Sequence, residues 1–312
     1  MKGIRYILTL LTLCVAVISC ERDEVNRYPI EGTGKMIKFS VESEWPEITR
    51  SVVNTSDNIK ESGFKVWSNL ALEADADDKH PVFGVNGATV SYQNGLWKCV
   101  KEQAWYKGHY DFAAALPPSL FQGTYSESTL NLQTGTSGYD LASRQDDLMY
   151  AFSNIDNSDG DASVVNLTFN HAFALLDIRI ATESKAPFAS EAVSDMKIMV
   201  YGIHRKMSGK LNISHSTDGV ISTNIAEILT EKTTEGNPYC YRPYTGGQGY
   251  NLSLNMISFF PSKLLVFPEN LAESPLTITI VVKRGSEEVT ISRTINEGVW
   301  SPGSTNVYIF EI

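Results

Sequence analysis

The chain has few cysteines, an excess of acidic over basic side chains, and no long apolar run beyond its N-terminus. Its 312 residues include 4 cysteines, 26 lysines and arginines, and 36 aspartates and glutamates, and the formal net charge is −10. Four cysteines without a paired spacing argue against a disulfide framework. The negative charge argues against nucleic acid as a partner, because a phosphate backbone would be repelled.

Motifs for metal binding and catalysis are also missing. The five histidines lack metal-ligand spacing, and neither HExxH nor a paired CxxC occurs. The acidic segment 156–161 has its glycine at the fifth position rather than the sixth, so it predicts a solvated turn and not a calcium loop. His171 is in phase with Leu167 and Phe169 and is interpreted as a core histidine. We therefore predict no enzymatic activity, metal or cofactor; a secreted hydrolase with distant carboxylates is a third, weaker hypothesis.

The N-terminus has the pattern of an export signal. Two basic residues precede an uncharged, mostly apolar run at 6–18, too short to span a membrane, which needs about 20 residues. Val17-Ile18-Ser19-Cys20 resembles the bacterial lipobox, which makes 1–19 a lipoprotein signal peptide and Cys20 the lipidated residue. Acyl chains contribute about 0.8 kcal/mol per buried CH₂, enough to anchor the protein to the outer membrane. The acidic residues that follow resemble the surface-export signal of Bacteroidetes lipoproteins.

Alternating apolar and polar residues predict β-strands along most of the remaining chain. The clearest patterns are those at 37–41, 165–171, 176–180, 276–282, 289–295 and 306–312. Asn94-Gly95 predicts a type I′ hairpin turn, and 225–231 is the best of few helix candidates. Many short strands separated by Gly, Pro and Asn turns predict an all-β fold built from β-sandwiches.

The polar segment that follows residue 181 contains a proline and divides the strand-rich chain into two blocks. We predict a tether at 20–34, an N-terminal β-sandwich domain at 35–181 and a C-terminal β-sandwich domain at 182–312. Cys99 and Cys240 then fall in different domains. Two free, partly buried thiols are favoured over a disulfide between them.

Three stretches together resemble the fimbrillin family of Bacteroidales, the Mfa-like subunits of type V pili. They are WYKGHYDFAAALP at 105–117, DLMYA at 147–151 with VNLTFNHAFA at 165–174, and VWSPGS at 299–304. Asn306 precedes Val307-Tyr308, so the aromatic alternation of the family's closing pattern is only partly kept. The resemblance implies two transthyretin-like β-sandwich domains in tandem and a role as a stalk or anchor subunit of a cell-surface fimbrium.

The resemblance also implies assembly by strand exchange with other fimbrillin subunits. In the family, an arginine-specific protease removes an N-terminal strand after lipoprotein export, and a strand of another subunit fills the groove. The corresponding residues are Ile37, Phe39 and Val41 in the removable strand, Arg50 and Ser51 at the cut, and Val307, Ile309 and Ile312 in the donor strand. An ordinary exposed loop arginine is the alternative for Arg50, and anchor subunits keep their first strand.

The competing hypothesis is a monomeric surface lipoprotein that binds glycans. It rests on five tryptophans that could stack on sugar rings: Trp45, Trp67, Trp97, Trp105 and Trp300. Burial in a sandwich core is the favoured interpretation of these side chains.

Overall fold

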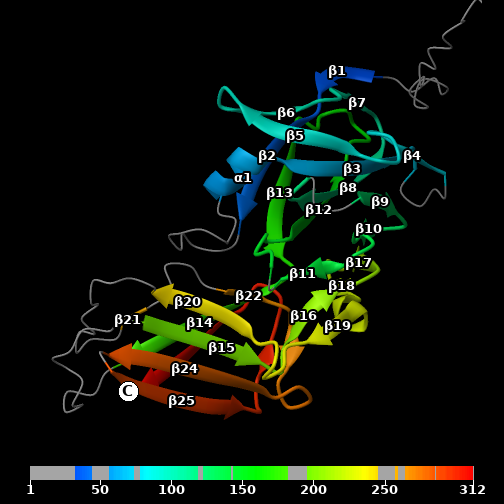
Figure 1. The fold of residues 1–312 in the computed structure, drawn as a ribbon. Helices are drawn as coiled ribbons and strands as arrows, with labels where there is room; N and C mark the ends of the chain where they lie inside the picture. Colours follow the sequence, from blue (N-terminus) through cyan, green and yellow to red (C-terminus); the bar gives the residue numbers. More distant parts are fainter. Residues whose placement is uncertain are drawn as a thin grey trace, which may run out of the picture.

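The computed structural model describes residues 32–43, 56–73, 78–118, 122–141, 143–181, 195–244, 257–258, 264–284 and 286–311. Strands dominate this part of the chain, which confirms the predicted all-β fold (Figure 1). No helix within it is long and apolar enough to span a membrane. Cys20, Arg50, Ser51 and Ile312 lie outside the described residues.

The largest sheet has eight strands in the order β2-β13-β12-β8-β3-β5-β6, with β4 paired to β3. They are β2 (Lys38–Ser43), β3 (Phe64–Ala71), β4 (Lys79–Pro81), β5 (Ala88–Gln93), β6 (Leu96–Cys99), β8 (His109–Leu116), β12 (Met149–Asp156) and β13 (Val164–His171). Successive side chains of a strand point to opposite faces of the sheet. Apolar residues of β3 and β8 lie on both faces and belong to two different core clusters. Phe64, Phe112 and Phe169 belong to the first core cluster on one face, together with Ile59 of helix α1 (Ser56–Ser62).

Smaller sheets connect distant parts of the sequence. Their elements are β1 (Gly32–Met36), β7 (Ala104–Tyr106), β9 (Gln122–Ser126), β10 (Thr129–Gln133), β11 (Tyr139–Asp140), β16 (His204–Met207), β17 (Lys210–His215), β18 (Ile221–Thr223), β19 (Leu229–Lys232) and the 3-10 helix η2 (Ile225–Ile228). β1 pairs with β7, β10 pairs with β17, and β11 pairs with β16. Strands beyond residue 204 are therefore hydrogen-bonded to strands that precede residue 141.

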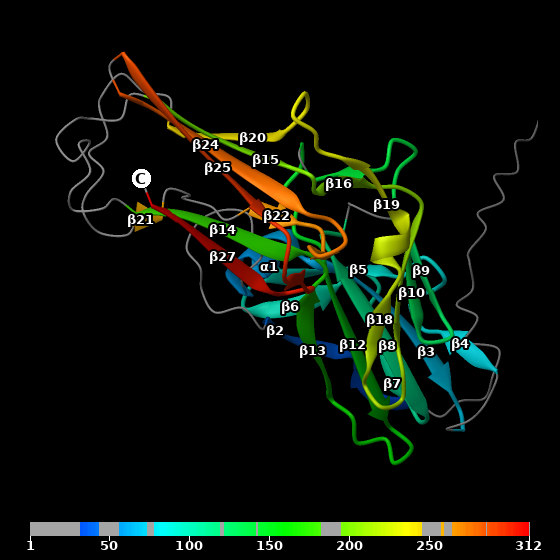
Figure 2. The same ribbon diagram turned by 90° about the horizontal axis from the view of Figure 1, so that it is seen from below.

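Two further sheets enclose a second core cluster. β14 (Ala174–Ala181) pairs with β21 (Ile257–Ser258), β22 (Leu264–Val266) and β27 (Thr305–Glu311). The other sheet has the order β20 (Tyr239–Tyr244), β15 (Asp195–Tyr201), β24 (Leu276–Arg284) and β25 (Glu287–Ile295), and β23 (Glu269–Asn270) pairs with β26 (Val299–Trp300). Ile178, Ile280 and Trp300 are buried in this second cluster. Figure 2 shows β14 and β27 side by side, as their pairing requires.

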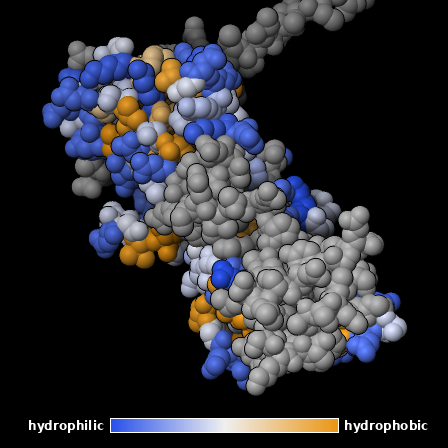
Figure 3. All heavy atoms as spheres, turned by 90° about the vertical axis from the view of Figure 1, so that its left-hand side faces the viewer, coloured by the Kyte–Doolittle hydropathy of each residue, from blue (hydrophilic) through white to orange (hydrophobic). Residues whose placement is uncertain are grey.

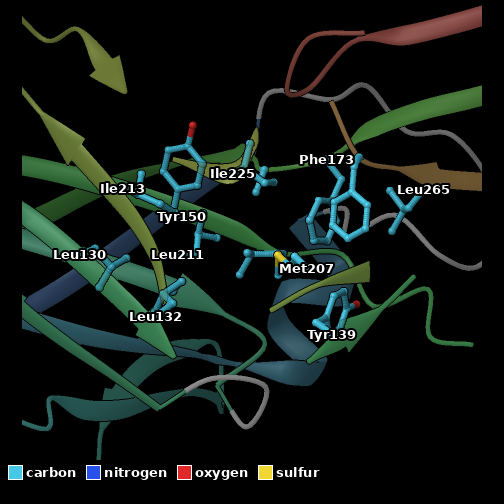
Figure 4. Close-up of a cluster of buried hydrophobic side chains, with 14 of the residues drawn as sticks. Leu130, Leu132, Tyr139, Tyr150, Phe173, Met207, Leu211, Ile213, Ile225 and Leu265 are labelled. Atoms are coloured by element: carbon cyan, nitrogen blue, oxygen red, sulfur yellow. The ribbon is translucent and has the colours of Figure 1, made fainter. Parts of the chain in front are cut away.

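A middle core cluster contains residues from both halves of the sequence (Figure 4). Trp67 and Tyr150 come from the eight-stranded sheet, whereas Leu265 comes from β22. The ring of Phe173 stacks on Tyr139 at 5.9 Å and meets the edge of Phe267 at 5.4 Å. On the face shown in Figure 3, apolar surface forms small patches among hydrophilic side chains, consistent with most large apolar residues lying inside the three clusters.

Several local predictions are confirmed, and others need correction. Asn94 and Gly95 have φ values of 53° and 81°, as the predicted hairpin turn requires. The helix predicted at 225–231 extends only over Ile225–Ile228, because β19 begins at Leu229. β1 begins at Gly32, inside the predicted tether. The division at residue 181 stays a prediction about folding units; β14, on its N-terminal side, pairs with strands of the C-terminal half.

Replacement of Phe173 by Ala tests the importance of the middle cluster. Phe173 is fully buried between two aromatic rings, so Phe173→Ala should lower the free energy of unfolding by about 3–5 kcal/mol. Urea unfolding measures this change. Val299→Ala is the control, because Val299 is 63% exposed and its loss should change stability by less than about 0.5 kcal/mol. Equal unfolding midpoints for Phe173→Ala and the unaltered protein would show that the middle cluster does not depend on Phe173.

Candidate functional site

The strand predicted to be removable lies at the edge of the eight-stranded sheet. β2 runs parallel to β13, from Lys38 opposite Val164 to Ser43 opposite Phe169. Within the described ranges, β13 is its only hydrogen-bonded neighbour. β6, at the other end of the strand order, and helix α1 also contact β2. The sheet therefore curves so that its two ends approach each other across the first core cluster.

Phe39 is the main apolar contact of β2 with the body of the protein. Its side chain is 7% exposed and lies in the first core cluster. The ring meets Phe64 at 5.8 Å and Phe112 at 6.5 Å, both edge to face, and lies 6.3 Å from Phe83. Ile37 and Val41 are partly buried against the same cluster. The structure thus brings the three predicted residues to one apolar face; removal of the strand stays a prediction.

Residues before β2 add a second attachment. The Ile37 backbone N–H donates to the Gln103 carbonyl at 2.9 Å, and the Thr33 hydroxyl donates to the Trp105 carbonyl at 3.1 Å. The Lys35 ammonium donates to the Gly160 carbonyl at 3.3 Å and lies 3.8 Å from an Asp161 carboxylate oxygen. The ion pair is exposed, so it adds at most about 1 kcal/mol. Most of the attachment of this segment therefore comes from strand pairing and Phe39.

The predicted donor strand occupies an edge position in the other part of the molecule. β27 runs parallel to β14, from Thr305 opposite Leu175 to Glu311 opposite Ala181. Phe310 is buried at 1% exposure, with the Arg293 guanidinium 5.5 Å from its ring centroid. Val307 and Ile309 are 44% and 40% exposed. β27 thus carries apolar side chains on both its buried and its exposed face.

The acidic segment and the core histidine have structural roles. The Asp156 carboxylate accepts from the Ser158 backbone N–H at 2.9 Å. Hydrogen bonds from the backbone and the side chain of Ser158 lower the pKa of Asp156. The segment is a turn, as predicted. His171 Nδ1 lies 2.7 Å from an Asp147 carboxylate oxygen, and both side chains are buried. Among the residues that the structure describes, no group of three His, Cys, Asp or Glu side chains could hold a metal.

The tryptophans and cysteines follow the favoured interpretations in most cases. Trp67, Trp105 and Trp300 are buried, whereas Trp97 is partly buried and Trp45 lies outside the described residues. Cys99 and Cys240 are both free. Burial raises the pKa of the Cys99 thiol, whereas Cys240 is exposed and not partly buried as predicted.

Sequence patterns missed the strand that precedes β2 and the side chains that contact Phe39. β1 contains two glycines and lacks a clear alternation, so nothing marked it as a strand. Phe64, Phe83 and Phe112 lie far along the chain from Phe39, and only their packing reveals the shared cluster. Tyr110 belongs to the same cluster, where burial raises its pKa to about 12 and its hydroxyl donates to the Tyr106 carbonyl at 3.2 Å.

A model of the family described as fimbrillin-like matches residues 49–312 of the chain. No curated protein matches. Similar solved structures include a fimbrial protein of Bacteroides vulgatus, with 15% identity, coverage of 89% of this chain and 95% of that one, and a TM-score of 0.45. A protein assigned to cell adhesion in Bacteroides uniformis has 14% identity, coverage of 89% and 93%, and a TM-score of 0.47.

Replacement of Phe39 by Ala should loosen β2 without unfolding the protein. Losing a buried Phe side chain costs about 3 kcal/mol or more, so amide hydrogens of β2 should exchange about a hundredfold faster. Hydrogen–deuterium exchange with peptide resolution measures this. Val307→Ala, a half-exposed position on the other edge strand, should leave exchange in β2 unchanged. Unchanged exchange in Phe39→Ala would show that Phe39 does not hold the strand.

Proposed function

Because the chain belongs to the fimbrillin-like family, we propose that it is a structural subunit, of the stalk or anchor type, of a cell-surface fimbrium that supports adhesion. The proposed subunit is exported as a lipoprotein and joins other fimbrillin subunits by exchange of an edge strand. The position of β2 carries this proposal. It is an edge strand that precedes Arg50, and it fills an apolar groove with Phe39.

Cleavage between Arg50 and Ser51 would separate β1 and β2 from the rest of the chain. Release of β2 would expose the backbone groups of β13 that now pair with it, and the rings of Phe64 and Phe112 that now contact Phe39. An unpaired edge beside an apolar groove is a template for a strand from another chain. Refilling the Phe39 position alone would contribute about 1.5–3 kcal/mol.

Strand direction also affects the free energy of exchanging β2 for a strand of another subunit. β2 pairs with β13 in parallel, and parallel pairing is slightly less stable per residue than antiparallel pairing. An incoming strand that entered antiparallel would therefore gain more from the same edge than β2 does. This difference would favour replacement of the first strand over its return.

The C-terminal strand supports the role of donor through its two apolar faces. Phe310 points into its own core, whereas Val307 and Ile309 are half exposed. A strand inserted between a groove and a neighbouring surface needs apolar residues on both faces. Because β27 pairs with β14 over its whole length, donation would require release of that pairing first.

Substitution of Arg50 tests the processing step. If an arginine-specific protease cuts here, Arg50→Ala should keep the chain at its uncut mass and abolish the ladder of polymers on denaturing gels. Intact-mass measurement of protein from the native cell surface reads out the first effect, with a mature chain starting at Ser51 expected for the unaltered protein. Arg27→Ala is the matched control. Unchanged mass and an unchanged ladder in Arg50→Ala would refute the cut.

Substitution of Cys20 tests the lipid anchor separately. Cys20→Ala should abolish incorporation of radiolabelled palmitate and move the protein from the membrane fraction to the soluble fraction, because acyl chains supply the membrane affinity. Cys240→Ala serves as the control for loss of a thiol elsewhere, since Cys240 is free and exposed. A membrane-bound Cys20→Ala protein would contradict lipidation at this residue.

A further inference from the structure

A polar groove lies beside the sheet formed by β9, β10 and β17. Its volume is about 510 Å³, within the range of pockets that hold small ligands. The side chains that decide its chemistry are Lys65, Gln122, Thr124, Asn131, Gln133 and Lys210. It involves neither β2 nor β27.

Strand pairing explains why these polar groups gather in the groove. Gln133 of β10 is directly opposite Gln122 of β9 on one side and Lys210 of β17 on the other. The next outward position, Asn131, is opposite Thr124. The alternating residues Leu130 and Leu132 point into the middle cluster. One face of the sheet is thus anchored in the core, and the other presents two rows of polar side chains.

The groove is positively charged in an acidic protein. Its described lining contains two lysines and no carboxylate, although acidic residues exceed basic ones in the chain by 36 to 26. Neither lysine forms an ion pair with a described residue, whereas Lys35, Lys79 and Lys206 do. The Lys65 ammonium lies 5.4 Å from the ring centroid of Trp67, and partial burial lowers the pKa of Lys65. One partly desolvated cation and one exposed cation, with no counter-charge among the described residues, favour an anionic ligand.

The amide groups add acceptors for hydroxyl groups. Asn131 donates through its side-chain nitrogen to the Thr129 carbonyl at 3.3 Å, and Gln133 donates to the Gly209 carbonyl at 3.0 Å. Since these nitrogens are held by the backbone, the amide oxygens remain to accept hydrogen bonds from a ligand. A ligand that carries both negative charge and several hydroxyl groups matches this set of donors and acceptors.

The edge of β9 disfavours a peptide as that ligand. An extended peptide would bind by pairing with the free backbone groups of the edge strand. The Trp67 indole N–H donates to the Gly123 carbonyl at 3.2 Å, and Gly123 is buried. We propose that the groove binds anionic sugar residues, carboxylated or sulfated, of an oligosaccharide. This adhesive activity goes beyond assembly and does not depend on strand exchange.

Isothermal titration calorimetry of the purified full-length protein tests the proposal with four probes. They are a galacturonic acid trisaccharide, a sulfated galactose trisaccharide, a neutral galactose trisaccharide and a hexaglutamate peptide. One or both anionic sugars should bind saturably, and the better of the two identifies the anionic group. Lys65→Gln and Lys210→Gln should each weaken that binding about tenfold, the typical effect of losing one charge-assisted hydrogen bond.

Two controls separate the groove from general charge effects. Lys98→Gln removes the same charge from an exposed position on β6 and should leave affinity unchanged. Thr124→Trp should block the groove while both lysines remain, and circular dichroism checks that each variant is folded. Equal binding of the neutral sugar, preference for hexaglutamate, or undiminished binding in a variant that carries both Lys65→Gln and Lys210→Gln would overturn the proposal. These results are independent of Arg50 cleavage, so they leave the assembly proposal untouched.

Discussion

The burial of both faces of the eight-stranded sheet along its central strands, β3 and β8, is the constraint on which the rest of the structure depends. In β8, Phe112 and Ala114 face the first cluster, whereas Ala113 and Ala115 face the middle cluster. Small residues on the second face leave space for Trp67 and Tyr150 beneath the sheet of β9, β10 and β17. Where both faces of a sheet are covered, its edges are left for interaction with another chain. The candidate assembly strand lies at an edge of this sheet, and the candidate donor strand lies at an edge of the separate sheet that contains β14.

The same constraint connects the two halves of the sequence. Leu265, from the C-terminal half, joins Phe173 in the middle cluster, and Gln145 holds the backbone of Leu265. Its side-chain oxygen accepts from the Leu265 backbone N–H at 2.7 Å, and its nitrogen donates to the Leu141 carbonyl at 2.6 Å. A polar side chain that satisfies buried backbone groups is costly to lose. The halves therefore share a core as well as hydrogen-bonded strands.

The sequence predicted the strands well because their signal is local. Val165, Leu167 and Phe169 alternate, and the structure places all three in one cluster. Strand pairing is not a local property, so the crossing of β16 and β17 into sheets with β11 and β10 could not be inferred. The groove with Lys65 and Lys210 was missed for the same reason. Each of its residues is an ordinary polar residue in its own strand, and only the pairing brings them together.

A single segment links the two edge strands. β13 and β14 are consecutive and separated by two residues, Ala172 and Phe173. β2 lies parallel to the first and β27 parallel to the second. In the proposed assembly, the edge that receives a strand and the edge that releases one are therefore parts of one extended backbone. Phe173 fixes the junction between them in the middle cluster, so the separation of the two edges is set by packing rather than by a flexible linker. A polymer built on these edges would inherit its subunit spacing from this segment.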